Sequence, residues 1–193
     1  MQLFKRSPKA LFVPALVSTL ALGLYGCNSM TPDDTMSMEA TMDGEMPVPA
    51  GYKSWPKFVS TIDKSSGHVR EIYINKTGLM AEQGEAFPSG TVSVMEIYNA
   101  QKGADGKPIT DAMGRFKKAD LAKVFVMAKG EGLGAMQPAG TIDNGDWIYS
   151  AYMGDGVTAA TSDFSGCRSC HLPLADDDYV ARYDEHFDYK MSW

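Results

Sequence analysis

The sequence predicts an α+β domain over residues 50–193, with an antiparallel β-sheet and flanking helices. Several short runs in this region are rich in β-branched and aromatic residues. Each is bounded by Gly, Pro, Asn or Asp, which is typical of strands joined by turns. Helical spacing of apolar residues occurs near the two ends of the region. Its length is close to the usual size of one domain, about 100–150 residues.

The first predicted element is a short helix from Trp55 to Ile62. The apolar residues Trp55, Phe58, Val59 and Ile62 have the i, i+3, i+4, i+7 spacing of one helix face. Pro56 fits the first turn of such a helix, where its missing N–H is tolerated.

Four strands follow, with irregular segments between them. In the second strand, alternation places Val92 and Val94 on one face and Ser93, Met95 and Ile97 on the other, together with Thr91. The predicted strands are 69–75, 91–98, 124–128 and 147–153, with a short helix at 79–83 and a loop at 103–114 that turns at Asp105-Gly106.

A second helix is predicted near the carboxyl end. Residues 176–178 are three aspartates, which favour a helix N-terminus. The buried face of this helix is then expected to hold Tyr179, Val180, Tyr183 and Phe187.

The segment before that helix contains a Cys-x-x-Cys-His motif, formed by Cys167, Cys170 and His171. This is the attachment pattern of a c-type haem. Each thiol adds to one vinyl group on an edge of the ring, and the next residue lies beneath the iron. The motif therefore predicts one covalently attached haem, with His171 as the proximal iron ligand.

Three other interpretations of the motif fit the sequence less well. A thioredoxin-like redox pair would sit in a βαβ pattern, and the surrounding sequence has none. A zinc site needs about four ligands, and His68 and His186 are not in finger-like spacing with the two cysteines. A structural disulfide would not need the histidine.

The amino-terminal residues 1–26 have the features of a lipoprotein signal peptide. Three basic residues precede an apolar run from Ala10 to Leu24, which is short for a membrane span. The run ends in Leu-Tyr-Gly-Cys, which resembles a lipobox and predicts lipidation of Cys27. An ordinary signal peptide is the alternative. Asn28 favours the outer over the inner membrane of a double-membraned bacterium, with the domain facing the periplasm.

The charge balance argues against a nucleic-acid partner. The whole chain has a net charge of −6, and removal of the three basic residues of the signal leaves it more acidic. Nucleic-acid binding requires a basic face. Membrane attachment through a lipid does not.

Residues 27–49 are predicted to be a flexible tether rich in Met, Asp and Thr. The stretch has no apolar periodicity and too little apolar surface to offset the entropy of ordering. Its methionines are compatible with Cu(I) binding, but their irregular spacing and the lack of histidine favour a plain acidic spacer.

Taken together, the domain resembles the cytochrome P460 family over about residues 51–187. No single piece is diagnostic, but their order and the place of the haem motif make the likeness fairly specific. The matching pieces are Tyr52-Lys53-Ser54-Trp55, Gly67-His68-Val69-Arg70, residues 72–75, residues 87–92, Val126-Met127-Ala128-Lys129, Gly145-Asp146-Trp147, residues 167–171 and Asp178-Tyr179-Val180.

The resemblance implies an antiparallel sheet with helices, often in a homodimer, His171 as proximal ligand, and chemistry on small nitrogen species. Hydroxylamine-oxidising members carry a lysine that is bonded to the porphyrin edge. The matching position here is Met95, whose thioether cannot form that bond. The chain is thus closer to the uncrosslinked, cytochrome c′-β-like members, which bind nitric oxide. Lys123 and Lys129 would compensate only under a different alignment.

Two further residues are candidates for the site. Met95 is expected near the haem, either as a sixth ligand or pocket wall, or as ordinary packing on a strand face. Active family members place a proton-transferring carboxylate near the haem, and Asp163 is the candidate for that catalytic role. An exposed loop acid is the simpler interpretation of Asp163.

Three functions are compatible with these residues. The first is a lipid-anchored mono-haem cytochrome that binds nitric oxide or a similar small nitrogen species. The second is an enzyme, an oxidoreductase acting on hydroxylamine or nitric oxide. The third is a periplasmic electron carrier with a redox partner protein, which requires a sixth ligand such as Met95, His68 or His186.

Overall fold

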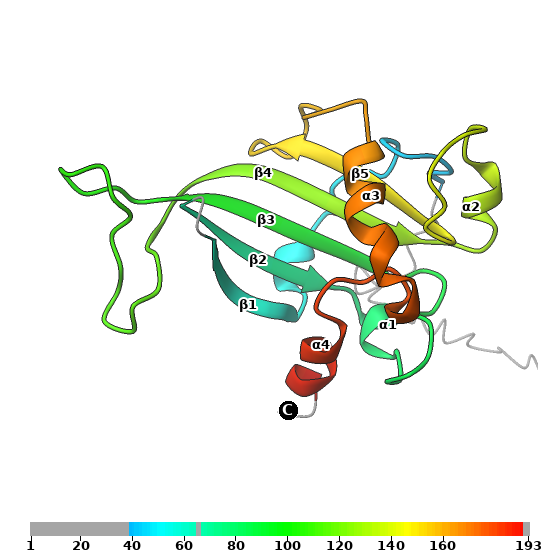
Figure 1. Cartoon of the computed structure of the whole chain (residues 1–193), viewed down its shortest axis with the longest axis horizontal. Helices are drawn as coiled ribbons and strands as arrows, with labels where there is room; N and C mark the ends of the chain where they lie inside the picture. The colour runs from blue at the N-terminus through cyan, green and yellow to red at the C-terminus, as the bar shows by residue number, and fades with distance from the viewer. Residues whose placement is uncertain (1–38, 65–66, 191–193) are drawn as a thin grey trace, which may run out of the picture. The chain divides into compact units, whose positions relative to one another are not determined.

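The computed structural model describes residues 39–64 and 67–190, which contain a five-stranded antiparallel sheet with short helices (Figure 1). The strands lie in sequence order, β1-β2-β3-β4-β5, and the predicted α+β class is confirmed. The predicted signal peptide and Cys27 lie outside the described residues. The elements are η1 Tyr52–Ser54, β1 Lys57–Lys64, β2 His68–Ile74, α1 Lys76–Leu79, β3 Val92–Ala100, β4 Lys118–Lys129, α2 Leu133–Met136, β5 Trp147–Met153, α3 Ser165–His171, η2 Leu172–Asp177 and α4 Tyr183–Lys190.

The four strands predicted from β-branched and aromatic runs are present as β2 to β5. β4 begins earlier than expected, at Lys118, because its first half mixes charged residues with alanine and leucine and contains no β-branched or aromatic residue that would signal a strand. Register places Met95 opposite Ile72 on β2 and opposite Phe125 on β4. Side chains of these three residues therefore form one row across the same face of the sheet.

The helix predicted at 55–62 is wrong, because most of this stretch is the edge strand β1. Its pairing with β2 changes register between Lys57 and Val59, and again between Val59 and Ile62. Each irregularity breaks the period-2 alternation of side chains. The resulting apolar spacing imitates the spacing of a helix face.

Two other predicted boundaries are also wrong. The short helix lies at Lys76–Leu79, ahead of the predicted 79–83, because Asn75 caps it by accepting a hydrogen bond from the Gly78 N–H. The aspartates at 176–178 do not cap the last helix. They end η2, where Asp178 is the C-cap residue in a left-handed conformation, and α4 begins only at Tyr183.

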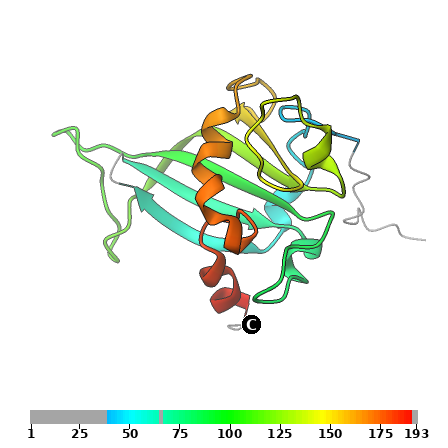
Figure 2. The same cartoon turned by 45° about the vertical axis from the view of Figure 1, so that its right-hand side comes forward.

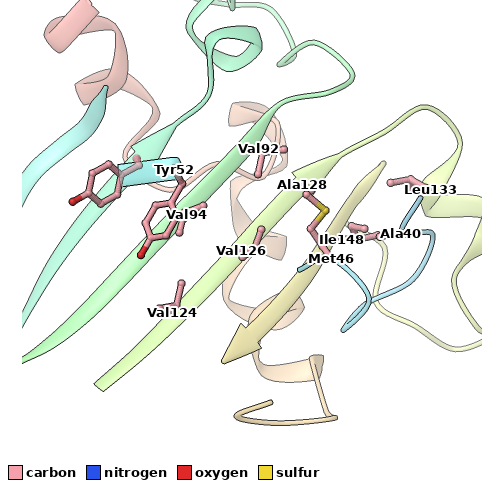
Figure 3. Packing of buried hydrophobic residues seen from close by; sticks show 11 residues of the cluster. Ala40, Met46, Tyr52, Val92, Val94, Val124, Val126, Ala128, Leu133 and Ile148 are labelled. Carbon is pink, nitrogen blue, oxygen red and sulfur yellow. The ribbon is translucent and has the colours of Figure 1, made fainter. Parts of the chain in front are cut away.

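One face of the sheet is covered by the segment that precedes β1. Met46 is buried in the apolar cluster of this face, together with Val94, Val126 and Ile148 (Figure 3). Residues 39–49 belong to the predicted flexible tether, yet Ala40 and Met46 are packed in the core. The other residues of the predicted tether, 27–38, lie outside the described residues.

The same face also carries two buried carboxylates directly opposite each other, Glu71 on β2 and Glu96 on β3. Like charges in this arrangement repel unless they are compensated. Glu96 accepts hydrogen bonds from the hydroxyls of Tyr52 at 2.6 Å and Tyr98 at 2.7 Å. Lysine side chains also balance the two negative charges. Lys53 forms an ion pair with Glu96, and Lys57 and Lys118 form ion pairs with Glu71.

The opposite face is covered by the carboxyl-terminal part of the chain. α3 crosses this face of the sheet in both views (Figure 2). Phe164, Val180, Tyr183 and Phe187 are buried here against Trp147 on β5. The predicted burial of Val180, Tyr183 and Phe187 is confirmed, and Tyr179 is partly buried. Within residues 39–64 and 67–190, no helix has the length and apolar character needed to span a membrane.

Candidate functional site

A cavity of about 420 Å³ lies on the α3 face of the sheet. That volume is within the range of ligand pockets, about 300–1,000 Å³. Its floor is built by alternate residues of β2 to β4, including Ile72, Met95 and Phe125. Thr91, Ser93 and Ile97 also line it, so the predicted facing of this strand is confirmed.

The helix α3 brings the motif residues to the same cavity. Cys167 and Cys170 are one helical turn apart, and His171 ends the helix; all three line the cavity. Cys167 is partly buried and Cys170 exposed, and no disulfide joins them. Burial raises the pKa of the Cys167 thiol. The helical turn thus presents two thiols and an imidazole along one side of the cavity.

The imidazole of His171 is held through one nitrogen. Nδ1 lies 2.6 Å from the backbone oxygen of Tyr179. A carbonyl oxygen only accepts hydrogen bonds, so Nδ1 carries the proton and the lone pair is left on Nε2. Burial lowers the pKa of His171, which favours the neutral form. A neutral imidazole with a free Nε2 is the form that binds a metal ion.

The backbone that presents this carbonyl is unusual. Asp178 and Tyr179 both have positive φ, at 50° and 60°. For residues other than glycine this conformation costs roughly 1–2 kcal/mol per residue. Strain of this kind persists only where neighbouring contacts impose it, and it is concentrated at functional sites.

Sequence reasoning missed a buried ion pair behind the motif. Arg168, between the two cysteines, is buried and pairs with Asp43 through Nε–Oδ2 at 2.7 Å and Nη2–Oδ1 at 3.0 Å. Its guanidinium also donates to the backbone oxygens of Ile142 and Trp147. The position of Arg168 inside the motif was a signal that its charge would need a buried partner. That partner, Asp43, could not be predicted because it lies in the predicted flexible tether.

Asp163 does not line this cavity. It is exposed, and its Oδ1 accepts the Ser165 N–H at 2.9 Å at the start of α3. That hydrogen bond lowers the pKa of Asp163. The side chain borders a different hollow of about 450 Å³, shared with Asp43 and Arg168. The geometry supports an exposed loop acid rather than a proton donor at the cavity.

The structure also shows where the other candidate iron ligands lie. Met95 lies in the floor of the cavity. His68 begins β2 and His186 is buried beside Phe58 and Phe87; neither histidine is among the residues that line the cavity. No lysine belongs to the described lining. Lys123 is exposed on β4, and Lys129 pairs with Asp178.

Several buried donors at the cavity have no protein partner in the described part of the chain. Arg70 Nε, Trp147 Nε1 and the Tyr149 hydroxyl belong to lining residues and make no hydrogen bond there. Buried donors of this kind normally have a partner. An occupant with a broad apolar surface and polar groups at its edge fits this lining, as a haem with its two propionates would.

Comparison with known proteins agrees with the geometry. A family model described as Cytochrome P460 matches residues 49–182, which is most of the chain and includes the cavity and the motif. The family predicted from the sequence is confirmed. No curated protein matches the chain.

Proposed function

This chain belongs to the cytochrome P460 family, and from that premise we propose that it is an exported, lipid-anchored, mono-haem c-type cytochrome that binds nitric oxide or a similar small nitrogen species. Cytochromes of this family bind haem c. The remaining elements of the proposal rest on particular residues of this chain.

The observation that carries the proposal is the grouping of Cys167, Cys170 and His171 along one side of a cavity. The two thiols would hold the haem through thioether bonds, and His171 would bind the iron through Nε2. When bound, the haem supplies an iron centre that takes up small diatomic ligands and exchanges one electron. Arg168 and Asp43 keep the helix that carries these groups fixed against β5.

The floor of the cavity supports ligand binding over cross-linked oxidation chemistry. Ile72, Met95 and Phe125 offer apolar surface, which suits a small neutral molecule. Met95 occupies the position where the resemblance expects a cross-linking lysine, and the described lining contains none. Asp163 borders another hollow, and the lining of the cavity contains no carboxylate among the residues that the structure describes.

A second candidate function is supported by Met95 itself. A thioether in the cavity floor is a potential sixth iron ligand, and a six-coordinate haem is suited to electron transfer with a redox partner protein. The two functions differ in whether the sixth position accepts an added ligand.

The optical spectrum of the purified holoprotein, reduced with and without nitric oxide, tests the proposal. A five-coordinate, high-spin ferrous spectrum that changes on addition of nitric oxide supports the binding function. A low-spin spectrum that does not respond contradicts it and favours the electron carrier. Turnover of hydroxylamine with an electron acceptor would instead establish the enzyme.

The proposed location rests on the amino-terminal sequence. Lipid on Cys27 would anchor the domain on the periplasmic side of a bacterial membrane, with the outer membrane favoured by Asn28. Growth of cells that express the wild type or Cys27→Ala on radiolabelled palmitate tests this. Label in the wild type but not in the variant supports the anchor, while an unlabelled wild type contradicts it. A homodimer, implied by the resemblance, stays a prediction for sedimentation analysis.

A further inference from the structure

We propose that Lys129 and Asp178 are positioning residues for the proximal ligand: their ion pair holds the turn whose carbonyl accepts the Nδ1 proton of His171, and so sets how strongly His171 donates electrons to the iron. This inference rests on the proposed function, in which His171 binds the haem iron.

The first step is the contact at His171. The Tyr179 oxygen lies 2.6 Å from Nδ1, which is a short hydrogen bond for an imidazole and a neutral acceptor. Hydrogen bonding at Nδ1 orients a metal-binding imidazole and raises its basicity. The position of this one carbonyl therefore affects the electronic character of the iron ligand.

The second step is the conformation that positions the carbonyl. Asp178 and Tyr179 are consecutive non-glycine residues with positive φ. Their backbone is secured on the η2 side by hydrogen bonds from Asp178 N–H to Ala175 O and from Tyr179 N–H to Leu174 O. The Tyr179 ring approaches Gly145, where a Cβ would lie 3.2 Å from the ring edge. The Val180 N–H, which belongs to the same peptide unit as the Tyr179 carbonyl, donates to the Asp177 oxygen at 2.9 Å. The carbonyl is thus oriented by a turn that closes around Asp178, so the position of Asp178 affects its direction.

The third step is the link from Asp178 to the sheet. Both carboxylate oxygens of Asp178 accept from Lys129 Nζ, at 2.8 and 2.7 Å, and Oδ2 also accepts the Phe87 N–H at 2.8 Å. Each of the two charged side chains is only 13% exposed. Because solvent is largely excluded, this pair is screened less than a surface ion pair.

Lys129 is itself held firmly. It lies at the end of β4 opposite Trp147, and its backbone N–H and oxygen bond to Thr91 and Gly90. Its ammonium lies 5.7 Å from the centre of the Trp147 ring. A continuous set of contacts thus runs from the sheet through Lys129, Asp178 and Tyr179 to His171.

The test uses resonance Raman spectroscopy and potentiometry on ferrous holoprotein. The iron–imidazole stretching frequency rises as the imidazole donates more strongly, and the reduction potential falls. We expect Lys129→Met and Asp178→Asn to lower the frequency and raise the potential. Lys129→Arg should restore both toward the wild type. Asparagine tolerates the left-handed conformation, so Asp178→Asn changes the charge with little change in backbone preference.

The matched control is Arg115→Met, which breaks the exposed ion pair with Asp111 in the β3–β4 loop. It should leave frequency and potential unchanged. If Lys129→Met and Asp178→Asn retain haem but show wild-type frequency and potential, even with a lower melting temperature, the inference is overturned and the pair is only structural. If Lys129→Met does not acquire haem, the frequency and potential of Asp178→Asn decide the test alone. Wild-type protein without haem would instead contradict the proposed function.

Discussion

The two faces of the sheet are built from alternate residues of the same strands, yet they are completed in different ways. On the Met46 face, Val94, Val126 and Ile148 are buried under the segment before β1, and the buried Glu96 has hydrogen-bonded partners. On the α3 face, neighbouring positions such as Met95 and Phe125 line a cavity, and buried donors there have no protein partner in the described part of the chain.

This difference separates what holds the fold from what performs the function. On the Met46 face the apolar side chains pack together and the buried carboxylates have hydrogen-bond or ion-pair partners, so this face contributes stability without a cofactor. The α3 face has the geometry of a binding site, with reactive side chains on one helix and an apolar floor on the strands. Substitutions on the two faces should therefore have separable effects.

The largest effect is expected from removing both thiols. In Cys167→Ser/Cys170→Ser, no thioether can form, so covalent haem should be lost completely. Absorbance of the denatured, acid-extracted protein measures this loss. Ser169→Ala, in the same helical turn, is the control and should keep its haem. Covalent haem retained in the double variant would contradict the assignment of the α3 face.

A large stability effect is expected on the other face from Glu96→Ala. The change leaves the buried hydroxyl of Tyr52 and the partly buried hydroxyl of Tyr98 without their acceptor. Unsatisfied buried groups cost about 1–3 kcal/mol each, so we expect a loss of about 3 kcal/mol in the free energy of unfolding. Urea denaturation measures it. The haem spectrum should be unchanged, and a shift of its bands would show that the two faces are coupled.

Adjacent residues on β3 give the sharpest comparison. Val94→Ala removes buried methyl groups from the Met46 face and should lower the unfolding free energy by about 2 kcal/mol with no spectral change. Met95→Ala changes the cavity floor and should cost less than about 1 kcal/mol, because Met95 is only partly buried. Its effect should be in the nitric oxide affinity, or in a change from low to high spin if Met95 binds the iron. The same spectral change in both variants would contradict the claim that the two faces of the sheet have separate roles.

The smallest effect concerns acid stability. Burial alone would raise the pKa of Glu96, but hydrogen bonds from Tyr52 and Tyr98 and the Lys53 ammonium outweigh it, and the pKa is lowered from its ordinary 4.5. A carboxyl with a lowered folded-state pKa contributes stability that is present above its unfolded pKa and is lost as pH falls through the folded value.

The unfolding free energy of the wild type should therefore fall as pH drops below about 4.5. Glu96→Gln, which does not titrate, should show a shallower fall. Urea denaturation at a series of acidic pH values compares the two slopes. Equal slopes would mean that Glu96 does not contribute to acid sensitivity.

Much of the α3 face could be predicted from the sequence because its signals are local. The motif residues are close in sequence, and period-2 alternation placed Ser93, Met95 and Ile97 on the cavity side. β1 was mistaken for a helix because its bulges, which arise from pairing with β2, disturb that alternation. Local patterns cannot report such tertiary features.

Two of the missed contacts join segments that are distant in sequence, and a third depends on an unusual turn. Asp43 pairs with Arg168, and Lys129 pairs with Asp178, across much of the chain. The Tyr179 carbonyl that meets His171 depends on a left-handed turn formed by Asp178 and Tyr179, residues that rarely adopt it. Composition and periodicity contain no signal for these pairings, and they became visible only in three dimensions.

The most direct test of the central claim is the mass of the motif peptide from holoprotein matured in a periplasm that attaches c-type haem. We predict a peptide containing residues 167–171 with the mass of one haem added to two thiols, and no bond to any other side chain. A colourless protein whose motif peptide carries two free thiols would contradict the account.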